Sequence, residues 1–458
     1  MKKVLFITLA AVLALSVGLI GCGGEEVPPE GPEKILVGLV RDLDGVLAFY
    51  DMFAAGPVYR AFTKLVNDEG GIYMSKYAEK KQIELVIRNY DPMTPGDLTT
   101  QTEALITQDK VHFLWGGPGT STIYPQAPIA NAYTKILMTL EGGATDMMAD
   151  PNKLASWPYV WINLSFSNWY QIPVLYGTLK AQGISEPKAY VVYNDSEFGH
   201  EYRDTTINIF GADNVIAVGH HPFAATTDDI EDLIVEAAAA LGDPANPNYD
   251  VFCGFTYDPH LAYILTAADA LDFNPPAMCM GPGAEGGAYL LTYGDKLEGV
   301  MAFAVANINT EIDEPTTMTL TEMWDLVKPQ GPEGFPADFN WGPWGHPIIF
   351  AGLEMWKQAV ETVGHLDEGY STEVRDVLAS FTKVNPATTV IGDCWYYVLG
   401  DGLGGGVIDY QAMPGQVCQW QNGYTEIVGY DGITDDIPKY DVTADLIYPM
   451  TDKWNWLP

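Results

Sequence analysis

The chain has 458 residues, enough for two or three domains of ordinary size. Its 23 basic and 60 acidic side chains give a formal net charge of −37. An exterior with that charge repels nucleic acid and anionic lipid headgroups, so the balance argues against both as partners of the folded protein.

The N-terminus has the pattern of a lipoprotein signal peptide. Two lysines precede an apolar run over residues 4–20, which ends in the sequence Leu-Ile-Gly-Cys. This looks like a bacterial lipobox, in which residues 1–21 are removed and Cys22 is lipidated. A plain signal peptide or a single membrane anchor is the alternative, but the cysteine after small residues argues against both. Residues 22–33 are rich in glycine, proline and glutamate, and we expect a flexible tether there.

Strands and helices then alternate in the first part of the chain. Short apolar runs predict buried strands, and apolar residues at helical spacing, such as Val58, Phe62 and Leu65, predict helices. The predicted strands are 35–40, 83–88, 111–115 and 136–140, and the later predicted helices are 98–108 and 123–134. Such alternation predicts a parallel sheet that is covered by helices on both faces.

The same alternation pauses near residues 156–170 and starts again. The second set of predicted strands is 189–194, 214–219, 250–255 and 277–281, and the helices between them are 198–210, 227–241 and 259–272. Two such runs predict two similar, doubly wound α/β lobes. The last third has predicted helices at 315–328, 346–364 and 372–382, followed by glycine-rich, hairpin-like sequence. We expect this third to complete the first two lobes.

The sequence GGPGTST at residues 116–122 predicts a binding loop. It follows an apolar strand, breaks it with three glycines and a proline, and ends in hydroxyl residues suited to begin a helix. Backbone N–H groups at such a helix start converge on one spot and attract an anion. The hydroxyls could instead only cap the helix.

No catalytic, metal or cofactor motif stands out. Residues 400–406, GDGLGGG, match the spacing of a dinucleotide fingerprint, but strand-like sequence follows where that motif needs a helix. Nucleophile-elbow, phosphate-loop and zinc-protease motifs are missing, and the histidines do not stand at metal-ligand spacing. The sequence therefore favours binding over catalysis, with no cofactor.

Four cysteines remain if Cys22 carries lipid. Cys394 and Cys418 flank a glycine-rich segment, and we expect them to form a disulfide across a hairpin. Cys253 and Cys279 each lie in a short predicted strand. They either pair or remain buried thiols, and the sequence leaves that choice open.

Taken together, these segments resemble the type I periplasmic binding proteins, and most of all the branched-chain amino acid subfamily that serves ABC transporters. The resemblance lies in GLVRDLDGVLAFYDMFAAG, LVNDEGGI, the loop at 116–122 with PIA after it, the segment 250–282 and QVCQWQNGYTEIV. It covers residues 34–430. It implies a ligand cleft between lobe 1 (34–165 and 305–412) and lobe 2 (166–304 and 413–458). Three hinge crossings, near 164–168, 299–308 and 410–418, would join the lobes.

The resemblance also implies a set of ligand-binding residues. Ser121, beside Thr122, matches the residue that holds the ligand carboxylate. Gly143, Ala144 and Thr145 match the segment that receives the ammonium group. The candidate aromatic wall is Tyr50, Phe198 and Tyr257. The family often has an acid directly after a Gly-Pro pair in the second lobe; here Gly283 takes that place and the nearest acid is Glu285.

The function implied is capture of a small amino acid or related carboxylate by hinge closure, followed by presentation to an ABC permease. A small amide or an aromatic acid is an alternative ligand. A lipoprotein that uses this fold to contact a cell-envelope partner is an alternative of another class. A secreted enzyme is a more distant third reading.

Overall fold

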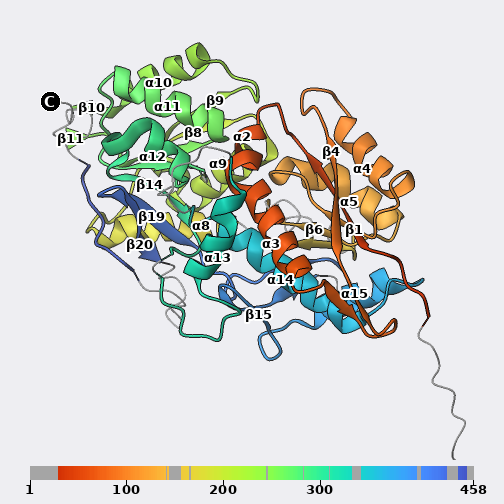
Figure 1. Ribbon diagram of the computed structural model, residues 1–458. Coiled ribbons are helices and arrows are strands. Elements are labelled where there is room, and N and C mark those ends of the chain that lie inside the picture. Colours follow the sequence, from red (N-terminus) through yellow and green to blue (C-terminus); the bar gives the residue numbers. More distant parts are fainter. Residues whose placement is uncertain are drawn as a thin grey trace, which may run out of the picture.

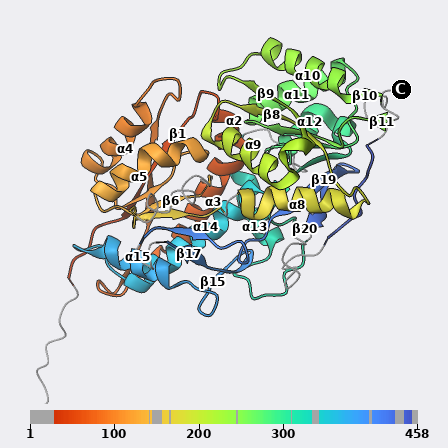
Figure 2. The ribbon, with the colours of Figure 1, turned by 180° about the vertical axis from the view of Figure 1, so that it is seen from behind.

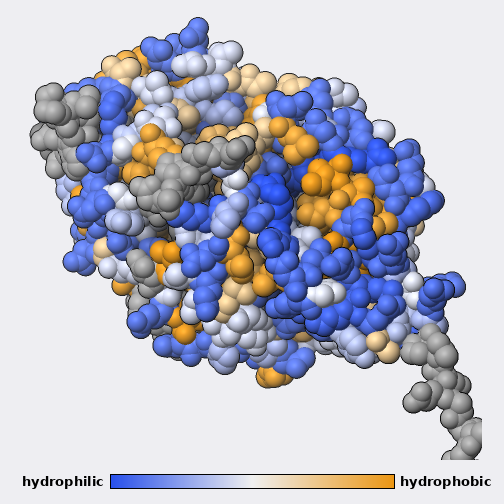
Figure 3. Space-filling view, in the orientation of Figure 1, coloured by the Kyte–Doolittle hydropathy of each residue, from blue (hydrophilic) through white to orange (hydrophobic). Residues whose placement is uncertain are grey.

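A computed structural model describes residues 29–140, 142–143, 156–164, 167–243, 246–281, 283–308, 310–332, 342–399, 404–430 and 442–450. Within these ranges the chain forms two lobes that lie side by side, each built on one seven-stranded sheet (Figure 1). The side of the molecule seen in Figure 3 is largely hydrophilic, with an apolar patch over the lobe that carries β4 (Ile83–Asn89) and α4 (Asp97–Thr107).

The first sheet has the strand order β17-β18-β7-β6-β5-β1-β4, and all its neighbouring strands are parallel except β17 and β18. Its other strands are β1 (Ile35–Arg41), β5 (Phe113–Trp115), β6 (Leu137–Thr139), β7 (Val160–Ile162), β17 (Tyr396–Val398) and β18 (Gly406–Ile408). The parallel strands end at one edge of the sheet, so the loops after β1, β5 and β6 meet there.

The second sheet has the order β20-β19-β14-β13-β12-β8-β9, with β19 and β20 running antiparallel to their neighbours. Its strands are β8 (Ala189–Asn194), β9 (Val215–His221), β12 (Val251–Phe255), β13 (Met278–Met280), β14 (Val300–Ala304), β19 (Gln416–Gln421) and β20 (Tyr424–Tyr430). Three small hairpins lie outside the two sheets: β2 (Ile72–Met74) with β3 (Glu79–Lys81), β10 (Gly242–Asp243) with β11 (Asn246–Pro247), and β15 (Ala387–Thr389) with β16 (Gly392–Cys394).

Helices cover both faces of the first sheet (Figures 1 and 2). These elements are α2 (Ala48–Tyr50), the π-helical turn η1 (Asp51–Ala55), α3 (Gly56–Asp68), α4, the 3-10 turn η2 (Thr120–Thr122), α5 (Ile123–Ala132), α13 (Leu320–Val327), η5 (Lys328–Gln330), α14 (Gly345–Val363) and α15 (Tyr370–Ser380). Alternate residues of a strand point to opposite faces. Accordingly Trp115 packs with Phe62 of α3 and Trp356 of α14, while Leu114 packs in the cluster on the α4 and α5 side.

The second sheet is covered in the same way. Its helical elements are α8 (Ser167–Ala181), α9 (Glu197–Phe210), η3 (Ala212–Asn214), α10 (Thr227–Leu241), α11 (Asp258–Ala270), α12 (Gly287–Tyr293) and η4 (Gly294–Leu297). Tyr202 of α9 contacts Phe255 on one face, and Tyr190 packs with Ile234 of α10 on the other. The start of α10 is fixed by a capping box, in which Thr226 and Asp229 satisfy each other's backbone N–H groups.

The prediction of two α/β lobes with largely parallel sheets is thus confirmed. The chain passes from the first sheet to the second between β7 and β8, returns between β14 and β17, and crosses again between β18 and β19. The exact lobe boundaries and the hinge role of these crossings stay predictions. In the described ranges, no helix has both the length and the apolar character needed to span a membrane.

The expected Cys394–Cys418 disulfide is not formed. Both residues are buried free thiols. Cys394 lies in the β15–β16 hairpin, whereas Cys418 lies in β19 of the second sheet, where its sulfur contacts the carbonyl oxygen of Ala302. The segment between the two cysteines does not fold into one hairpin, because it crosses from one lobe to the other. Cys253 and Cys279 are register partners on neighbouring strands, and both are also free thiols.

Candidate ligand site between the lobes

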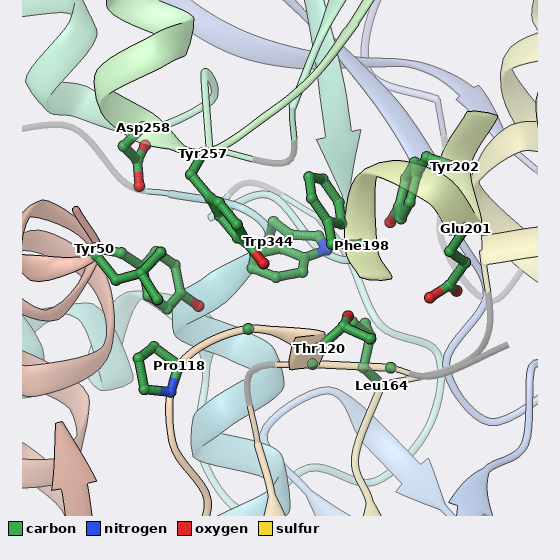
Figure 4. Close-up of a pocket in the computed structure, with 14 residues that line it drawn as sticks. Tyr50, Pro118, Thr120, Leu164, Phe198, Glu201, Tyr202, Tyr257, Asp258 and Trp344 are labelled. Atoms are coloured by element: carbon green, nitrogen blue, oxygen red, sulfur yellow. The ribbon is translucent and has the colours of Figure 1, made fainter. Parts of the chain in front are cut away.

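A cavity of about 50 Å³ lies between the two lobes (Figure 4). Loops at the strand ends of the first sheet supply one wall, and α9 together with the start of α11 supplies the other. The lining residues from the first lobe are Leu47, Tyr50, Pro118, Gly119, Thr120, Gly142, Gly143, Leu164 and Trp344. Those from the second lobe are Phe198, Glu201, Tyr202, Tyr257 and Asp258.

The loop at 116–122 is held in shape by hydrogen bonds of its own. The N–H of Gly117 donates to the side-chain oxygen of Gln126 at 2.8 Å. The hydroxyl oxygen of Thr122 lies 3.0 Å from the carbonyl oxygen of Gly117 and 2.9 Å from that of Gly119. Thr122 is buried and does not line the cavity. Its position is therefore that of a loop brace, while Thr120, which the sequence did not single out, lines the cavity.

Ser121 and Tyr257 meet across the lobes. Their hydroxyl groups are both buried, and neither forms a hydrogen bond within the described part of the chain. Burial raises the pKa of Tyr257 to about 12, and the neighbouring hydroxyls of Ser121 and Ser196 oppose that shift. Two buried hydroxyls without partners are costly unless a ligand or water completes them.

Glycine is required where the walls approach most closely. A Cβ atom at Gly119 would come within 2.9 Å of the Tyr257 hydroxyl, and one at Gly142 would come within 2.7 Å of the Gly119 carbonyl carbon. The pair Gly142-Gly143 thus lies against the binding loop, and Gly143 lines the cavity as expected. The other two residues predicted for this segment, Ala144 and Thr145, lie outside the described residues.

Aromatic rings from both lobes line the cavity. The ring centroid of Phe198 is 5.2 Å from that of Tyr257 and 4.7 Å from that of Tyr202. On the first lobe, the rings of Tyr50 and Trp344 are 6.2 Å apart. Trp344 is 5% exposed, and its indole N–H forms no hydrogen bond with any described residue. The structure thus brings the three predicted aromatic residues together and adds two that were not predicted.

Glu285 lies in a second cavity, of about 30 Å³, which shares Tyr50 and Asp258 with the first. Its side chain is buried, and its carboxylate accepts a hydrogen bond from the N–H of Gly283 at 2.7 Å. Burial raises the pKa of Glu285 to about 8. The structure therefore places this residue beside the main cavity rather than in its wall.

Asp258 stands on the wall between the two cavities. The Tyr289 hydroxyl donates to its backbone oxygen at 2.6 Å and lies 3.2 Å from its carboxylate. Burial raises the pKa of Asp258 to about 7. With Glu201, which is 8% exposed, it makes the main cavity acidic. No lysine or arginine appears among the described residues that line either cavity.

Some cavity-lining residues that were not predicted lie at sequence positions related to the predicted ones. Glu201 follows Phe198 by three positions on α9 and so lies on the same helix face. Asp258 directly follows Tyr257. Trp344 lies just before the predicted helix 346–364, in a segment for which no helix or strand was predicted, and no local pattern indicated that it lines the cavity. The described residues contain no group of histidine, cysteine, aspartate or glutamate side chains able to hold a metal ion.

Several solved structures share this fold. One is a leucine-binding protein from Thermotoga maritima, with 15% identity, 88% of this chain and 100% of that chain covered, and a TM-score of 0.64. Another is a solute-binding protein of an ABC transporter from R. palustris in complex with 4-hydroxybenzoate (14% identity, 88% and 99% covered, TM-score 0.63). A third is a branched-chain amino acid transporter substrate-binding protein from Streptococcus pneumoniae in complex with isoleucine. It has 17% identity, 86% of this chain and 99% of that chain covered, and a TM-score of 0.63.

At these identities the structures establish the fold alone. No curated protein matches the chain in sequence. The family model described as periplasmic binding protein matches residues 34–396, which is most of the chain and includes every residue that lines the main cavity. The two lobes, the three passages between them and this match agree, and the chain belongs to the type I periplasmic binding protein family.

Proposed function

We propose that this chain is a lipid-anchored, extracytoplasmic solute-binding protein that captures a small amino acid or related carboxylate for an ABC importer. The observation that carries the proposal is the meeting of Ser121 from the first lobe and Tyr257 from the second, whose two buried hydroxyls form no hydrogen bond with the residues that the structure describes. A ligand carboxylate at the start of α5 would accept hydrogen bonds there and meet the positive end of the helix dipole.

The proposed mechanism is binding by closure, without chemistry on the ligand. The first lobe would hold the ligand through the loop at 116–122 and the segment at 142–145. The second lobe would then close over it with Phe198 and Tyr257. Closure removes water from the charged groups and strengthens their hydrogen bonds. X-ray scattering should show a smaller radius of gyration at saturating ligand, and an unchanged radius would contradict closure.

A thermal-shift screen of amino acids and small carboxylates tests the ligand class. A ligand that binds only the folded state must raise the melting temperature, by an amount that grows with its concentration. An amino acid that does so supports the proposal. If none of the amino acids or carboxylates stabilises the protein at millimolar concentration, the proposed ligand class is wrong.

An aromatic acid is the second candidate ligand. The cavity wall contains the rings of Tyr50, Phe198, Tyr202, Tyr257 and Trp344, and such rings favour contact with another ring. The R. palustris neighbour was solved in complex with 4-hydroxybenzoate. Including benzoates in the same screen separates the two ligand classes.

The lipid anchor has its own test. Cys22→Ser should leave an uncleaved precursor or release unlipidated protein, because the lipid is attached to that sulfur. Normal processing and membrane retention of the variant would contradict the anchor without bearing on the ligand.

A further inference from the structure

The Tyr257 side chain reaches from the second lobe toward the loop of the first lobe that carries Pro118 and Thr120 (Figure 4). Its ring centroid lies 5.2 Å from that of Phe198 and 5.7 Å from that of Phe223. Tyr257 is the N-cap residue of α11 and follows the end of β12 closely. A side chain on such a loop is held accurately only when the groups around it are themselves fixed.

The threonine next to Tyr257 lies between two buried histidine rings. The hydroxyl oxygen of Thr256 is 3.0 Å from Nε2 of His221 and 3.1 Å from Nδ1 of His260. All three residues are at most 2% exposed, and the two ring centroids are 4.7 Å apart. The other nitrogen of His221, Nδ1, is 3.0 Å from the carbonyl oxygen of Pro222.

These contacts determine the direction of each hydrogen bond. A carbonyl oxygen can only accept, so Nδ1 of His221 carries a proton. Burial lowers the pKa of both rings, that of His260 to about 4, so each ring is neutral and has one N–H group. Nε2 of His221 therefore accepts from the Thr256 hydroxyl. Because that hydroxyl has one hydrogen, its oxygen must accept from Nδ1–H of His260. The hydrogen-bond chain runs one way, from His260 to Pro222.

This hydrogen-bond chain joins the ends of two strands that do not pair with each other. His221 is the last residue of β9 and Thr256 directly follows β12, and β8 lies between these strands in the sheet. The turn that carries Phe223 is thereby tied to the backbone on both sides of Tyr257. Thr256 precedes Tyr257, and His260 follows it by three positions and donates its backbone N–H to the Tyr257 carbonyl oxygen at 3.0 Å.

We propose that Thr256 is a positioning residue: through this hydrogen-bond chain its hydroxyl holds Tyr257 in the place from which it meets the ligand. Thr256 lines neither cavity, so it acts through Tyr257. A hydrogen-bond chain with one allowed direction specifies one arrangement, because reversing a member sets two donors or two acceptors against each other. Tyr257 is then in place before the ligand arrives, and less ordering is needed on binding. The role in binding rests on the proposed function.

The direction of the hydrogen-bond chain can be measured on the ligand-free wild-type protein. Nitrogen-15 NMR of the imidazole rings at neutral pH shows which nitrogen carries the proton. His221 and His260 should both be protonated on Nδ1 alone, and variants that lack one ring assign the signals. If either ring carries its proton on Nε2 instead, the direction is wrong and the proposal is overturned. This measurement needs no variant of Thr256 to fold.

The position of Tyr257 is measured with a fluorinated tyrosine placed at position 257 alone by amber suppression. Thr256→Val keeps the side-chain shape without the hydroxyl and should split or broaden the fluorine NMR signal, because the ring is no longer held in one place. Thr256→Ser keeps the hydroxyl and should restore a single sharp signal. A single sharp signal in Thr256→Val would overturn the proposal.

Thr178→Val is the matched control for the loss of a buried hydroxyl. Thr178 is a buried threonine on α8 of the same lobe, its hydroxyl donates to the carbonyl oxygen of Val174 at 2.7 Å, and it lines neither cavity. This variant should keep the single fluorine signal of the wild type. Splitting in Thr178→Val as well would show a general loosening of the lobe and would contradict a specific role of Thr256.

Binding is measured by isothermal titration calorimetry with L-leucine and 4-hydroxybenzoate as probes. A probe that binds the wild type should bind Thr256→Val about tenfold more weakly, and Thr256→Ser and Thr178→Val about as tightly as the wild type. Equal affinity for Thr256→Val and the wild type would overturn the role in binding. If neither probe binds the wild type, the proposed ligand class is contradicted, and the tautomers and the fluorine signal decide by themselves whether Thr256 positions Tyr257.

Discussion

The Tyr257 hydroxyl of the second lobe lies so close to Gly119 of the first that a single methyl group at position 119 would come within 2.9 Å of it. Gly119 also has a φ of +79°, a conformation that side chains other than glycine disfavour. The close approach and the positive φ both belong to the glycine-rich loop after β5, whose backbone lies directly against the opposite lobe. We therefore expect closure of the lobes to require that position 119 has no side chain.

Gly119→Ala should weaken ligand binding at least tenfold, because the added methyl group keeps Tyr257 from its closed position. Gly96→Ala is the matched control. Gly96 has the same φ of +79°, but no atom lies within 4 Å of the Cβ position there. Both variants should therefore lose about 1–2 kcal/mol of stability from backbone strain, and only Gly119→Ala should lose affinity. Calorimetry and denaturant titration of the pair measure the two effects.

A second-site change sharpens this comparison. Tyr257→Phe removes the oxygen that the new methyl group would meet, so the double variant should recover part of the affinity lost in Gly119→Ala. If Gly119→Ala and Gly96→Ala bind ligand equally well, the contact with Tyr257 does not govern closure.

Ser121 and Thr122 are neighbours with opposite expected roles. Thr122→Val removes the hydroxyl that braces the loop through Gly117 and Gly119 and should cost about 1–2 kcal/mol of stability. Ser121→Ala removes a buried hydroxyl that has no hydrogen-bond partner in the described part of the chain, so the stability of the free protein should hardly fall. If the Ser121 hydroxyl binds a charged ligand, Ser121→Ala should lower the ligand affinity ten- to hundredfold, which is a binding free energy of about 1.5–3 kcal/mol. Unchanged affinity in Ser121→Ala would leave this hydroxyl without a binding role.

The alternating pattern of strands and helices was enough to predict both lobes. Apolar runs such as 189–194 coincide with β8, because a strand buried on both faces is apolar throughout. The short strand β7 and the following helix α8 were not predicted. Their segment, SWPYVWINLSFSNWY, is rich in aromatic residues and carries a crossing between lobes, so neither periodicity appears in it.

The site was less predictable than the fold, because its walls come from distant segments. The resemblance placed Tyr50, Phe198 and Tyr257, and the structure brings all three to one cavity. Glu285 was expected in the same site but lies next to it, since the backbone at Gly283 turns with a φ of +130° and the carboxylate binds back to that N–H. Trp344 could not be placed, because only tertiary structure brings the start of α14 to the cavity.

The cysteines give a prediction in which the structure corrects the sequence. Alkylation of the denatured protein without a reductant should modify Cys253, Cys279, Cys394 and Cys418 alike, because all four are free thiols. A reductant should leave the melting temperature unchanged. Peptide mass spectrometry identifies the modified residues, and a Cys394–Cys418 crosslinked peptide would contradict the separation of these residues between the lobes.

Two buried acids next to each other should make the stability of the free protein depend on pH. Burial raises the pKa of Asp258 to about 7 and that of Glu285 to about 8, and the Asp258 carboxyl group also raises the pKa of Glu285. The Tyr289 hydroxyl opposes the shift of Asp258, and the N–H of Gly283 opposes that of Glu285. In the unfolded chain both groups ionise near pH 4. Between about pH 4 and pH 8 the folded state therefore holds more protons than the unfolded state.

These two groups lower the stability as the pH rises through this window, by at most about 1.4 kcal/mol per pH unit for each group. Below about pH 6.5 the opposite effect comes from four histidines whose pKa burial lowers: His112, His221, His260 and His346. We therefore expect the ligand-free protein to melt at a higher temperature at pH 6.5 than at pH 8. Glu354, whose pKa burial raises to about 7, contributes in the same direction. The double variant Asp258→Asn, Glu285→Gln should lose much of the slope, and Glu354→Gln a smaller part. Calorimetric scans at half-unit pH steps measure the slope, and a wild-type melting temperature that rises from pH 6.5 to pH 8 would contradict the raised pKa values of these acids.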